Sequence, residues 1–276
     1  MSNLIHQPCG DCGSSDALQI NIAENGAVKS TFCHSCGQYT AASDGYSPVE
    51  IPEPSEPKPK PDFSSVERML TTANYQAIVS RGLNTATAKT YGILEKPDKT
   101  YFSYHDPEDA NVPIAAKIRL PDKNFYNVGN WSGAGLFGQQ LFNGGGKYIT
   151  LCEGEFDAAA AYQMQGSKYA CVSVRNGAGG ALKDCKAAYE YLDSFEAIII
   201  CFDADEAGCK ASKEVAELFS GKAAIVKHTG GHKDACDYLV ANDIKGFTAA
   251  FWAAEKFVPD GIINGASLWD EVNRPV

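Results

Sequence analysis

Two short acidic stretches, residues 153–157 and 203–208, contain the side chains best suited to chemistry in this chain. Each follows an apolar run typical of a buried strand and precedes a helix-like run. Carboxylates at the carboxyl ends of two strands of one sheet meet where open α/β sheets bind ligands. So many carboxylates repel one another unless cations neutralise them, and oxygen ligands favour a hard ion such as Mg²⁺. The pattern predicts a divalent-metal site for phosphate chemistry.

The spacing within each stretch indicates a shared direction. Glu153 ends its strand, and Asp157 follows one helical turn later on the same face. Asp203 and Asp205 are two residues apart, so in an extended segment both point the same way. Glu153, at the rim, is the candidate general base or a ligand that shares both tasks. Acids that only cap helices or face water are the alternative.

The elements that must position these acids alternate between strand and helix. Strands are expected at residues 147–152, 169–174, 197–202 and 223–227, with helical crossovers between them. That alternation predicts an α/β fold with a parallel, helix-flanked sheet over residues 147–257. The glycine-rich loop at residues 175–180 can bring backbone N–H groups to a phosphate.

A basic, mixed α+β segment is expected at residues 63–146, with a helix over 64–79. Residues 80–91 are expected to form a turn and a short helix capped by Asn84 or Thr85. Strands are expected at 100–104, 112–120 and 124–128, and alternation there puts Lys117 and Arg119 on one face, with Lys123 in the next turn. A phosphate-binding face and a merely solvated strand face fit these residues equally well. The aromatic residues that follow are expected in the core rather than as base-stacking platforms: Trp131, Phe137 and Phe142.

Two Cys-x-x-Cys elements lie within residues 1–43 and comprise Cys9, Cys12, Cys33 and Cys36. Strands at residues 18–22 and 27–32 flank an Asn-Gly turn, which indicates a hairpin. Four thiolates at this spacing predict one structural Zn²⁺, which would supply folding free energy to so small a β module. Free thiols or a disulfide pair are the alternative.

Residues 44–62 form a linker that contains six prolines. Proline fixes φ and removes donors, so the linker is expected to be extended and semi-rigid, either as a tether that lets the zinc module move or as a passive spacer.

The formal net charge of −10 does not exclude a nucleic-acid partner, because many acids lie in the linker and the metal site. Without a signal peptide or an apolar run near the ~20 residues of a membrane span, a soluble, intracellular protein is expected.

The Glu-Gly-x-x-Asp element, the Asp-x-Asp element and a later Asp together resemble the Toprim domain of primases, topoisomerases and some nucleases. The resemblance implies a Rossmann-like core with a mainly parallel four-stranded sheet. The best match for the later acid is Asp234, with Asp237 as the competitor. The implied Mg²⁺ ligands are Glu153, Asp157, Asp203, Asp205 and Asp234.

Almost the whole chain resembles the primase half of podovirus primase–helicase proteins, through residues 9–16, 31–33, 122–125, 136–138, 142–145, 153–155, 188–191, 202–208 and 259–261. The resemblance implies that the zinc module reads a short DNA template. It implies that the Toprim core joins ribonucleotides into RNA primers with Mg²⁺, two ions being expected and Mn²⁺ a substitute. The implied catalytic residues are Glu153, Lys117, Lys123 and Arg119, and the implied DNA contacts are Ser30, His34, Lys117 and Lys123.

The same resemblance implies the partners and the setting. The partners are a single-stranded DNA template, ribonucleoside triphosphates, a replicative helicase domain or hexamer, and the replicative DNA polymerase, with no membrane. Residues 258–276 are expected to begin the linker towards a helicase domain, and the protein is expected in the cytoplasm of an infected bacterium. Ser30 stands where the family's type member has a histidine, so template preference is expected to differ. His34 could replace a zinc ligand, touch DNA or simply be exposed.

Two other classes of protein remain open at this stage. A metal-dependent Toprim nuclease would use the same acids to cut DNA. A non-catalytic recombination mediator would use the zinc module and the Toprim domain only to bind DNA, and it would tolerate loss of the acids.

Overall fold

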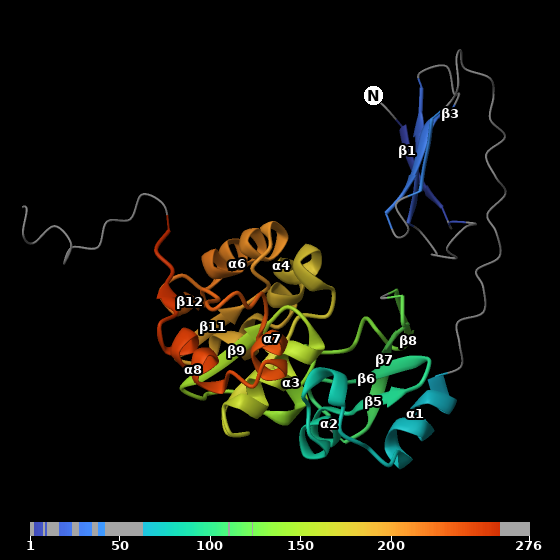
Figure 1. Ribbon diagram of the computed structural model, residues 1–276. Coiled ribbons are helices and arrows are strands. Elements are labelled where there is room, and N and C mark those ends of the chain that lie inside the picture. Colours follow the sequence, from blue (N-terminus) through green and yellow to red (C-terminus); the bar gives the residue numbers. More distant parts are fainter. Residues whose placement is uncertain are drawn as a thin grey trace, which may run out of the picture. The chain divides into compact units, whose positions relative to one another are not determined.

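The computed structural model describes residues 3–7, 9, 17–23, 28–34, 38–41, 63–109, 111–122 and 124–259. The chain divides into two compact units, Met1–Pro61 and Asp62–Val276 (Figure 1). None of the described helices has the length and apolar character that crossing a bilayer requires.

The described part of the smaller unit is an antiparallel sheet in the order β1 (Asn3–Gln7), β2 (Leu18–Ile22), β3 (Val28–Cys33) and β4 (Tyr39–Ala41). The predicted hairpin is confirmed, because β2 pairs with β3 and Ile22 is the partner of Val28. The alternation of β2 and β3 places Ile20 and Cys33 on the buried face. The outer strands β1 and β4 were not predicted from the sequence.

The larger unit contains a second antiparallel sheet. Its strand order is β5 (Ile93–Lys96), β6 (Lys99–His105), β7 (Pro113–Arg119) and β8 (Phe125–Gly129). Helix α1 (Phe63–Thr72), the short 3₁₀ turn η1 (Val79–Arg81) and α2 (Thr85–Tyr91) precede it. The helix predicted over residues 64–79 is corrected to a shorter one, because α1 ends at Thr72 and residues 73–77 form neither a helix nor a strand. The predicted cap of α2 is confirmed for Asn84, whose side chain accepts a hydrogen bond of 2.8 Å from the Thr87 amide. Strand β5 was not predicted, since its Ile-Leu-Glu-Lys sequence does not alternate.

The alternation of β7 determines which residues reach the site. Ala116 and Ile118 pack with α1 in one cluster on one face of the sheet. Lys117 and Arg119 project from the other face, towards α3 (Glu155–Met164), where they contact Glu155 and Phe156. The prediction that the two basic residues share a face is confirmed.

A third sheet forms the core of the larger unit, with strand order β10 (Ala170–Ser173), β9 (Tyr148–Cys152), β11 (Ala197–Cys201), β12 (Ala223–Ile225) and β13 (Glu255–Lys256). The first four strands are parallel, as predicted. The predicted four-stranded sheet is corrected to five strands, because β13 adds an antiparallel edge. Two charged residues have no strand periodicity, so only their pairing with β12 makes β13 a strand.

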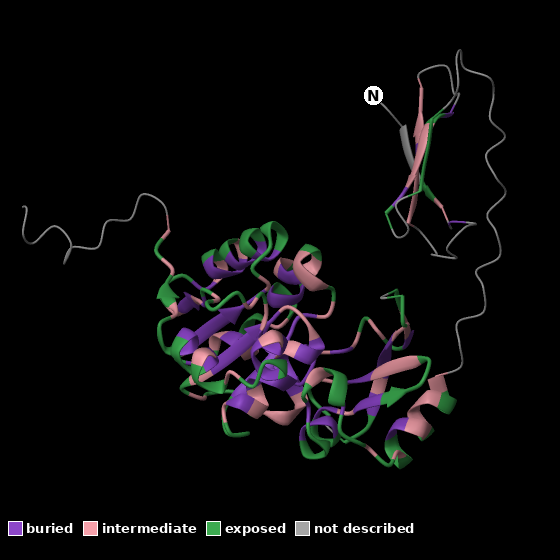
Figure 2. Ribbon diagram, viewed as in Figure 1, coloured by how far each residue is buried: buried purple, intermediate pink, exposed green. Residues whose placement is uncertain are grey.

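Helices cover both faces of this sheet (Figure 1). Helices α3, α7 (Ala235–Val240) and α8 (Ile244–Trp252) pack with Ile199 and Cys201 on one face. Helices α4 (Gly177–Ala187), α5 (Tyr189–Asp193) and α6 (Glu206–Leu218) pack with Ile198 and Ile200 on the other. The four parallel strands are therefore buried on both faces (Figure 2), whereas the edge strand β13 is exposed.

The three aromatic residues assigned to the core are found there. Phe137 is fully buried, and Trp131 and Phe142 are partly buried and pack against the same hydrophobic cluster. The Phe142 residue follows the 3₁₀ turn η2 (Gln139–Leu141). The prediction of a core role for these residues is confirmed.

Candidate functional site

The acidic residues meet at one edge of the central sheet. Glu153 directly follows β9, and Asp203 follows β11 after a single phenylalanine. The two strands are parallel neighbours, with Cys152 opposite Cys201, so both acids emerge at the same carboxyl edge. Asp157 lies in the first turn of α3, and Asp234 is the N-cap of α7 on the same side of the sheet.

Glu153 is held by the glycine-rich segment at residues 175–180, and the loop prediction is corrected here, because the segment from Gly177 onwards forms the first turn of α4. Its Oε1 accepts a hydrogen bond of 3.1 Å from the Ala178 amide. Its Oε2 is buried and has no hydrogen-bond partner. The first turn of α4 therefore directs the Ala178 N–H group at the Glu153 carboxylate. The other Glu153 oxygen stays buried and can accept a proton or bind a cation.

Three of the other acids accept hydrogen bonds from backbone amides, two of them local and one between helices. Asp205 caps α6 by accepting a hydrogen bond of 2.8 Å from the Gly208 amide. Asp234 caps α7 in the same way, with a hydrogen bond of 2.7 Å from the Asp237 amide. Asp157 Oδ1 accepts a hydrogen bond of 3.0 Å from the Cys236 amide, which ties α3 to α7. The helix-cap alternative thus describes Asp205 and Asp234, but capping does not remove them from the cluster.

Gly208 lets α6 begin close to Asp203. A Cβ atom at this position would collide with the carbonyl oxygen of Asp203. A side chain here would push the start of α6 away from the strand end. The glycine therefore supports the placement of Asp203 and Asp205 in one turn.

The pKa values of the acids report their crowding. Burial, then the charges of Glu153, Asp234 and Asp205, raise the pKa of Asp203 to about 7. Burial, then Asp234 and Asp203, hold the pKa of Asp157 well above its usual range. Burial also raises the pKa of Glu153, against backbone hydrogen bonds that lower it. The acids are therefore near neighbours in a partly desolvated site.

Asp234 belongs to this cluster, whereas Asp237 makes a local bond. Asp234 raises the pKa values of both Asp203 and Asp157. Asp237 Oδ2 instead accepts a hydrogen bond of 3.0 Å from the Lys233 amide in its own loop. The geometry favours Asp234 as the later acid of the site.

The carboxylate oxygens of these acids suit a hard divalent cation, although the described side chains do not form a preformed metal-binding site. All donors are carboxylate oxygens, which are the ligands of Mg²⁺, and the orphaned oxygen of Glu153 lacks a partner. Within the described ranges, no three acidic, histidine or cysteine side chains are grouped closely enough to hold a metal ion. Their mutual repulsion is the electrostatic cost that a bound cation would remove.

Metal-free protein is expected to lose thermal stability as the pH rises from about 4 to about 7. The folded pKa of Asp203 is about 7 and lies above its ordinary value, so protonation favours the folded state and its stabilising effect is lost through this window. Glu153 and Asp157 shift in the same direction. Calorimetry with and without Mg²⁺ checks this, since stabilisation by Mg²⁺ should grow with pH. Asp203→Asn should flatten the metal-free profile, and an unchanged profile would contradict the clustering.

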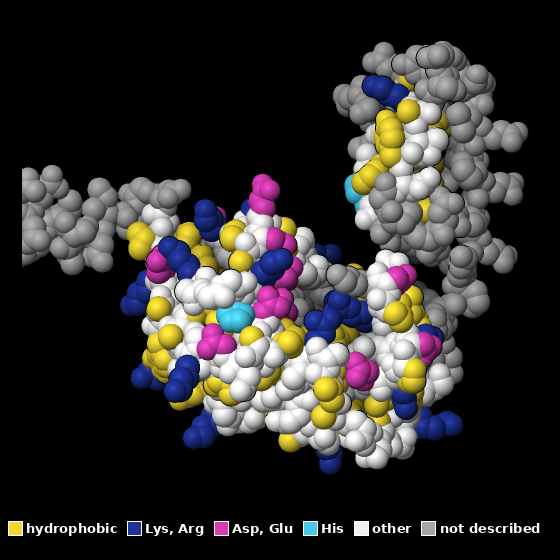
Figure 3. Space-filling view, viewed as in Figure 1, with side chains coloured by type: hydrophobic (Ala, Val, Ile, Leu, Met, Phe, Trp, Pro, Cys, Tyr) yellow, Lys and Arg dark blue, Asp and Glu magenta, His cyan; other side chains and the backbone are white. Residues whose placement is uncertain are grey.

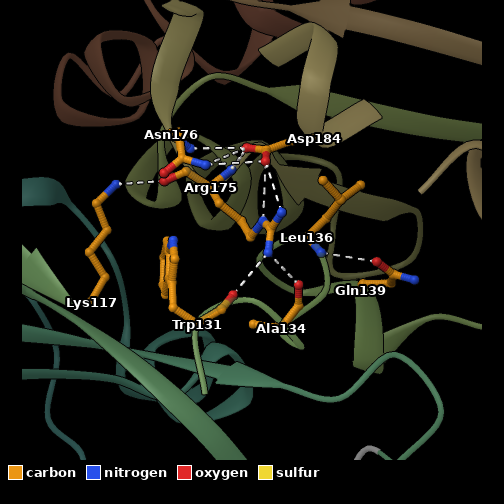
Figure 4. Close-up of polar contacts among 8 residues, drawn as sticks. All are labelled: Lys117, Trp131, Ala134, Leu136, Gln139, Arg175, Asn176 and Asp184. Carbon is orange, nitrogen blue, oxygen red and sulfur yellow. Dashed lines mark hydrogen bonds and ion pairs between the residues drawn. The ribbon is translucent and has the colours of Figure 1, made fainter. Parts of the chain in front are cut away.

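Lys117 lies against this acidic edge and is itself buried, with 11% of its side-chain surface exposed. Its Nζ is 2.8 Å from Glu155 Oε1. It also donates a hydrogen bond of 3.1 Å to the Arg175 carbonyl (Figure 4). Tyr104 Oη donates 2.7 Å to the same Glu155 oxygen. The solvated-face alternative therefore does not describe Lys117, whose ammonium group is fixed by the Glu155 carboxylate and the Arg175 carbonyl.

A buried ion pair fixes the loop that holds Lys117. Asp184 is buried. Its Oδ1 accepts a hydrogen bond of 3.0 Å from Arg175 Nη2, and its Oδ2 accepts one of 2.8 Å from the Arg175 amide. Arg175 Nη1 donates to the carbonyl groups of Trp131 and Ala134, at 3.0 and 2.7 Å (Figure 4). Sequence reasoning missed Glu155, Arg175 and Asp184, because nothing in their spacing reveals partners that come from separate elements.

A small basic pocket adjoins the first turn of α3 at Phe156. It encloses about 260 Å³ and is lined by Arg81, Lys96, Lys99 and Arg119 around Phe156, among others. The guanidinium carbons of Arg81 and Arg119 lie 4.8 and 5.9 Å from the centre of the Phe156 ring. Acidic and basic side chains thus gather side by side on this face of the larger unit (Figure 3). Lys123, the other predicted basic residue, lies outside the described residues.

The smaller unit contains the predicted zinc ligands. Cys9 and Cys33 are 1% and 0% exposed, while Cys12 and Cys36 lie outside the described residues. His34 is exposed, and its Nε2 is 2.8 Å from Gln19 Oε1. The Ser30 hydroxyl accepts a hydrogen bond of 2.9 Å from Asn21 Nδ2. Ser30 thus lies within β3, and His34 directly follows that strand.

Comparison with known proteins agrees with this architecture. The Toprim-like family matches residues 150–239, which contain all five acids. The chain is 33% identical over 275 residues to a DNA helicase/primase of Enterobacteria phage T3 and spans about half of that protein, 47% of its length. A crystal structure of the primase fragment of the bacteriophage T7 primase–helicase is 32% identical and has a TM-score of 0.59, with 91% of this chain and all of the fragment covered.

Two further solved structures share the fold. One contains primase domains of two subunits with the bacteriophage T7 lagging-strand DNA polymerase, an RNA/DNA hybrid and dTTP. It is 36% identical with a TM-score of 0.59, over 67% of this chain and 94% of that one. The zinc-binding and RNA polymerase domains of the Aquifex aeolicus primase are 13% identical with a TM-score of 0.50, over 92% and 81% of the two chains, and agree in fold alone.

The acidic edge, the basic residues beside it and a match to the whole T7 primase fragment lead to one assignment. This chain belongs to the family of phage primase–helicase proteins and corresponds to their primase part.

Proposed function

We propose that this chain is a DNA primase that synthesises short RNA primers on a single-stranded DNA template. The observation that carries the proposal is the acidic cluster at the carboxyl edge of the sheet, together with the ammonium group of Lys117, which is paired with Glu155, two residues after Glu153. Nucleotidyl transfer needs both, because carboxylates can manage protons and metal ions while a cation stabilises phosphate charge. The match to a primase fragment along its whole length supports this choice among Toprim activities.

The proposed reaction joins the 3′-hydroxyl of one ribonucleotide to the α-phosphorus of the next and releases pyrophosphate. Glu153 is the proposed proton acceptor, because burial raises its pKa and one of its oxygens has no partner. Lys117, Arg119 and Lys123 are proposed to face the phosphates. Glu155 and the Arg175 carbonyl act as positioning groups, since they orient Lys117 without needing to touch substrate.

The proposed cofactors are Mg²⁺ at the acidic edge and one structural Zn²⁺ in the smaller unit. Asp203, Asp205, Asp234, Asp157 and Glu153 would hold Mg²⁺, two ions being proposed and Mn²⁺ a substitute. Bound Mg²⁺ would supply Lewis-acid stabilisation of phosphate charge. Cys9, Cys12, Cys33 and Cys36 would hold Zn²⁺, and the burial of Cys9 and Cys33 supports this assignment.

The proposed organisation divides the chain into a zinc module (residues 1–43), a linker (44–62), a basic subdomain (63–146), a Toprim core (147–257) and a segment leading towards a helicase (258–276). A helicase domain and a replicative DNA polymerase are proposed partners, because a relative is a helicase/primase and another structure pairs primase domains with a polymerase. Ser30 and His34 are proposed template contacts. The proposed setting is the cytoplasm of an infected bacterium.

One assay tests this proposal against the two other classes. The full chain is incubated with a mixed-sequence single strand, Mg²⁺ and labelled ribonucleotides. Template-dependent oligoribonucleotides are expected. Shortened DNA would instead indicate a Toprim nuclease, and unchanged DNA without RNA would indicate a binding module, so either result would overturn the proposal.

A further inference from the structure

One exposed aromatic ring stands apart from those in the core. Phe125 opens β8 and is 55% exposed, whereas the other described phenylalanines are buried or half-buried. Single exposed apolar residues are common, so exposure alone decides nothing. What distinguishes Phe125 is the chemistry around it.

Basic residues of the candidate site surround this ring. The Nζ of Lys117 lies 4.6 Å from the ring centre, in cation–π contact. Arg119 is the cross-strand partner of Phe125 in the β7–β8 ladder. Strand β8 is the edge of its sheet, so no further strand covers Phe125 from that side. An aromatic ring set among cations at an open edge is the arrangement with which proteins bind unpaired bases.

The cation that contacts the ring is itself fixed close to the start of α3. Lys117 is fixed by Glu155 at 2.8 Å and by the Arg175 carbonyl at 3.1 Å. The cation that contacts the ring is therefore part of the network beside Glu153. A base stacked on Phe125 would bring its own sugar and phosphate close to Lys117 and Arg119.

We propose that Phe125 is a stacking platform for an unpaired nucleobase, with Lys117 on one side of the ring and the base on the exposed side. This inference rests on the proposed function, because it places a substrate base beside the nucleotidyl-transfer site. The base could come from the DNA template or from a ribonucleoside triphosphate, and both present the same planar surface. The stacking is sequence-tolerant, because every base has such a surface.

The test compares Phe125→Ala, Phe125→Tyr and Phe125→Trp in the full chain. Tyr169→Ala is the matched control, because Tyr169 is an exposed aromatic residue that precedes the amino end of β10, whereas the acids lie at the carboxyl ends of the parallel strands. Circular dichroism and thermal melting first verify that each variant folds. Equilibrium titrations then measure binding of a 2-aminopurine-labelled single strand and of ATP, and dinucleotide synthesis gives KM for the nucleotide.

Phe125→Ala is expected to weaken binding of the stacked partner by about 5- to 150-fold, the range for loss of one base–aromatic stack. The tyrosine and tryptophan variants should bind nearly as well as the wild type, and Tyr169→Ala should have no effect. A weaker affinity for the strand alone identifies a template base. A raised KM and weaker ATP binding alone identify the nucleotide.

Salt dependence separates stacking from charge. Phe125→Ala should leave the slope of log affinity against log salt unchanged, whereas Arg119→Ala should reduce it by about 0.7 for a single strand. Unchanged binding of both ligands by Phe125→Ala, or an equal loss in Phe125→Trp, would overturn the proposal. Because the titrations need no turnover, a wild-type chain that makes no RNA but still shows the Phe125 effect would reject the proposed function and keep the stacking site.

Discussion

Glu153→Gln is expected to lower dinucleotide synthesis by about 10²- to 10⁴-fold, the usual contribution of a positioned acid–base group. Glutamine keeps the size of the side chain and can still accept the hydrogen bond from the Ala178 amide, so the loop should keep its conformation. Glutamine cannot accept a proton as a carboxylate does. With its oxygen kept towards the Ala178 amide, its NH₂ group takes the place of the unpartnered Oε2. The measurement is dinucleotide formation under saturating Mg²⁺.

Glu190→Gln is the matched control, because Glu190 is an exposed acid of α5 away from the acidic edge. It should leave synthesis unchanged. Binding of a single strand by Glu153→Gln should also stay near that of the wild type, since the substitution removes a negative charge and no basic residue. Normal synthesis by Glu153→Gln would remove the proton-acceptor role from this residue.

Cys33→Ser is expected to lose most of the bound zinc and to lower template-directed synthesis at least about tenfold, because metal binding and folding of so small a module are linked. Cys33 is fully buried at the end of β3, where its amide donates 2.9 Å to the Gln38 carbonyl. Serine cannot supply a thiolate. Zinc content by a colorimetric chelator and synthesis on a defined template provide the two measurements.

Cys209→Ser supplies the control for this substitution, since Cys209 is an exposed cysteine of α6 in the larger unit. It should keep both zinc and synthesis. Cys33→Ser should retain the thermal transition of the larger unit, Asp62–Val276, which forms a separate compact body. Full template-directed synthesis by zinc-free protein would show that the smaller unit has another role.

Much of the secondary structure could be read from local patterns. The parallel strands β9–β12 are short apolar runs between helical segments, and the β2–β3 hairpin is marked by an Asn-Gly turn. The cap at Asn84 follows from one residue type beside one helix. The strands β5 and β13 were missed because they are strands through pairing with a neighbour, and their own sequences have no strand periodicity.

The candidate site divides in the same way. The acids at residues 153, 157, 203, 205 and 234 could be found because each has a set place relative to a strand end or a helix start. The partners of Lys117 could not, since Glu155 is 38 residues away and the Arg175 carbonyl is 58 residues away along the chain. Phe125 looked like any strand residue until its exposure and its contact with Lys117 were known.

The strand–helix alternation, the placement of carboxylates at strand ends and the shared face of Lys117 and Arg119 can all be read from the linear chain. These features depend on periodicity and local spacing, which a linear chain contains in full. Only the tertiary structure decided which carboxylates crowd one another, why the pKa of Asp203 rises to about 7, and that Lys117 is buried against Glu155. The physical reason is that desolvation and Coulomb interactions depend on distance in space, and folding sets that distance between residues far apart in the chain.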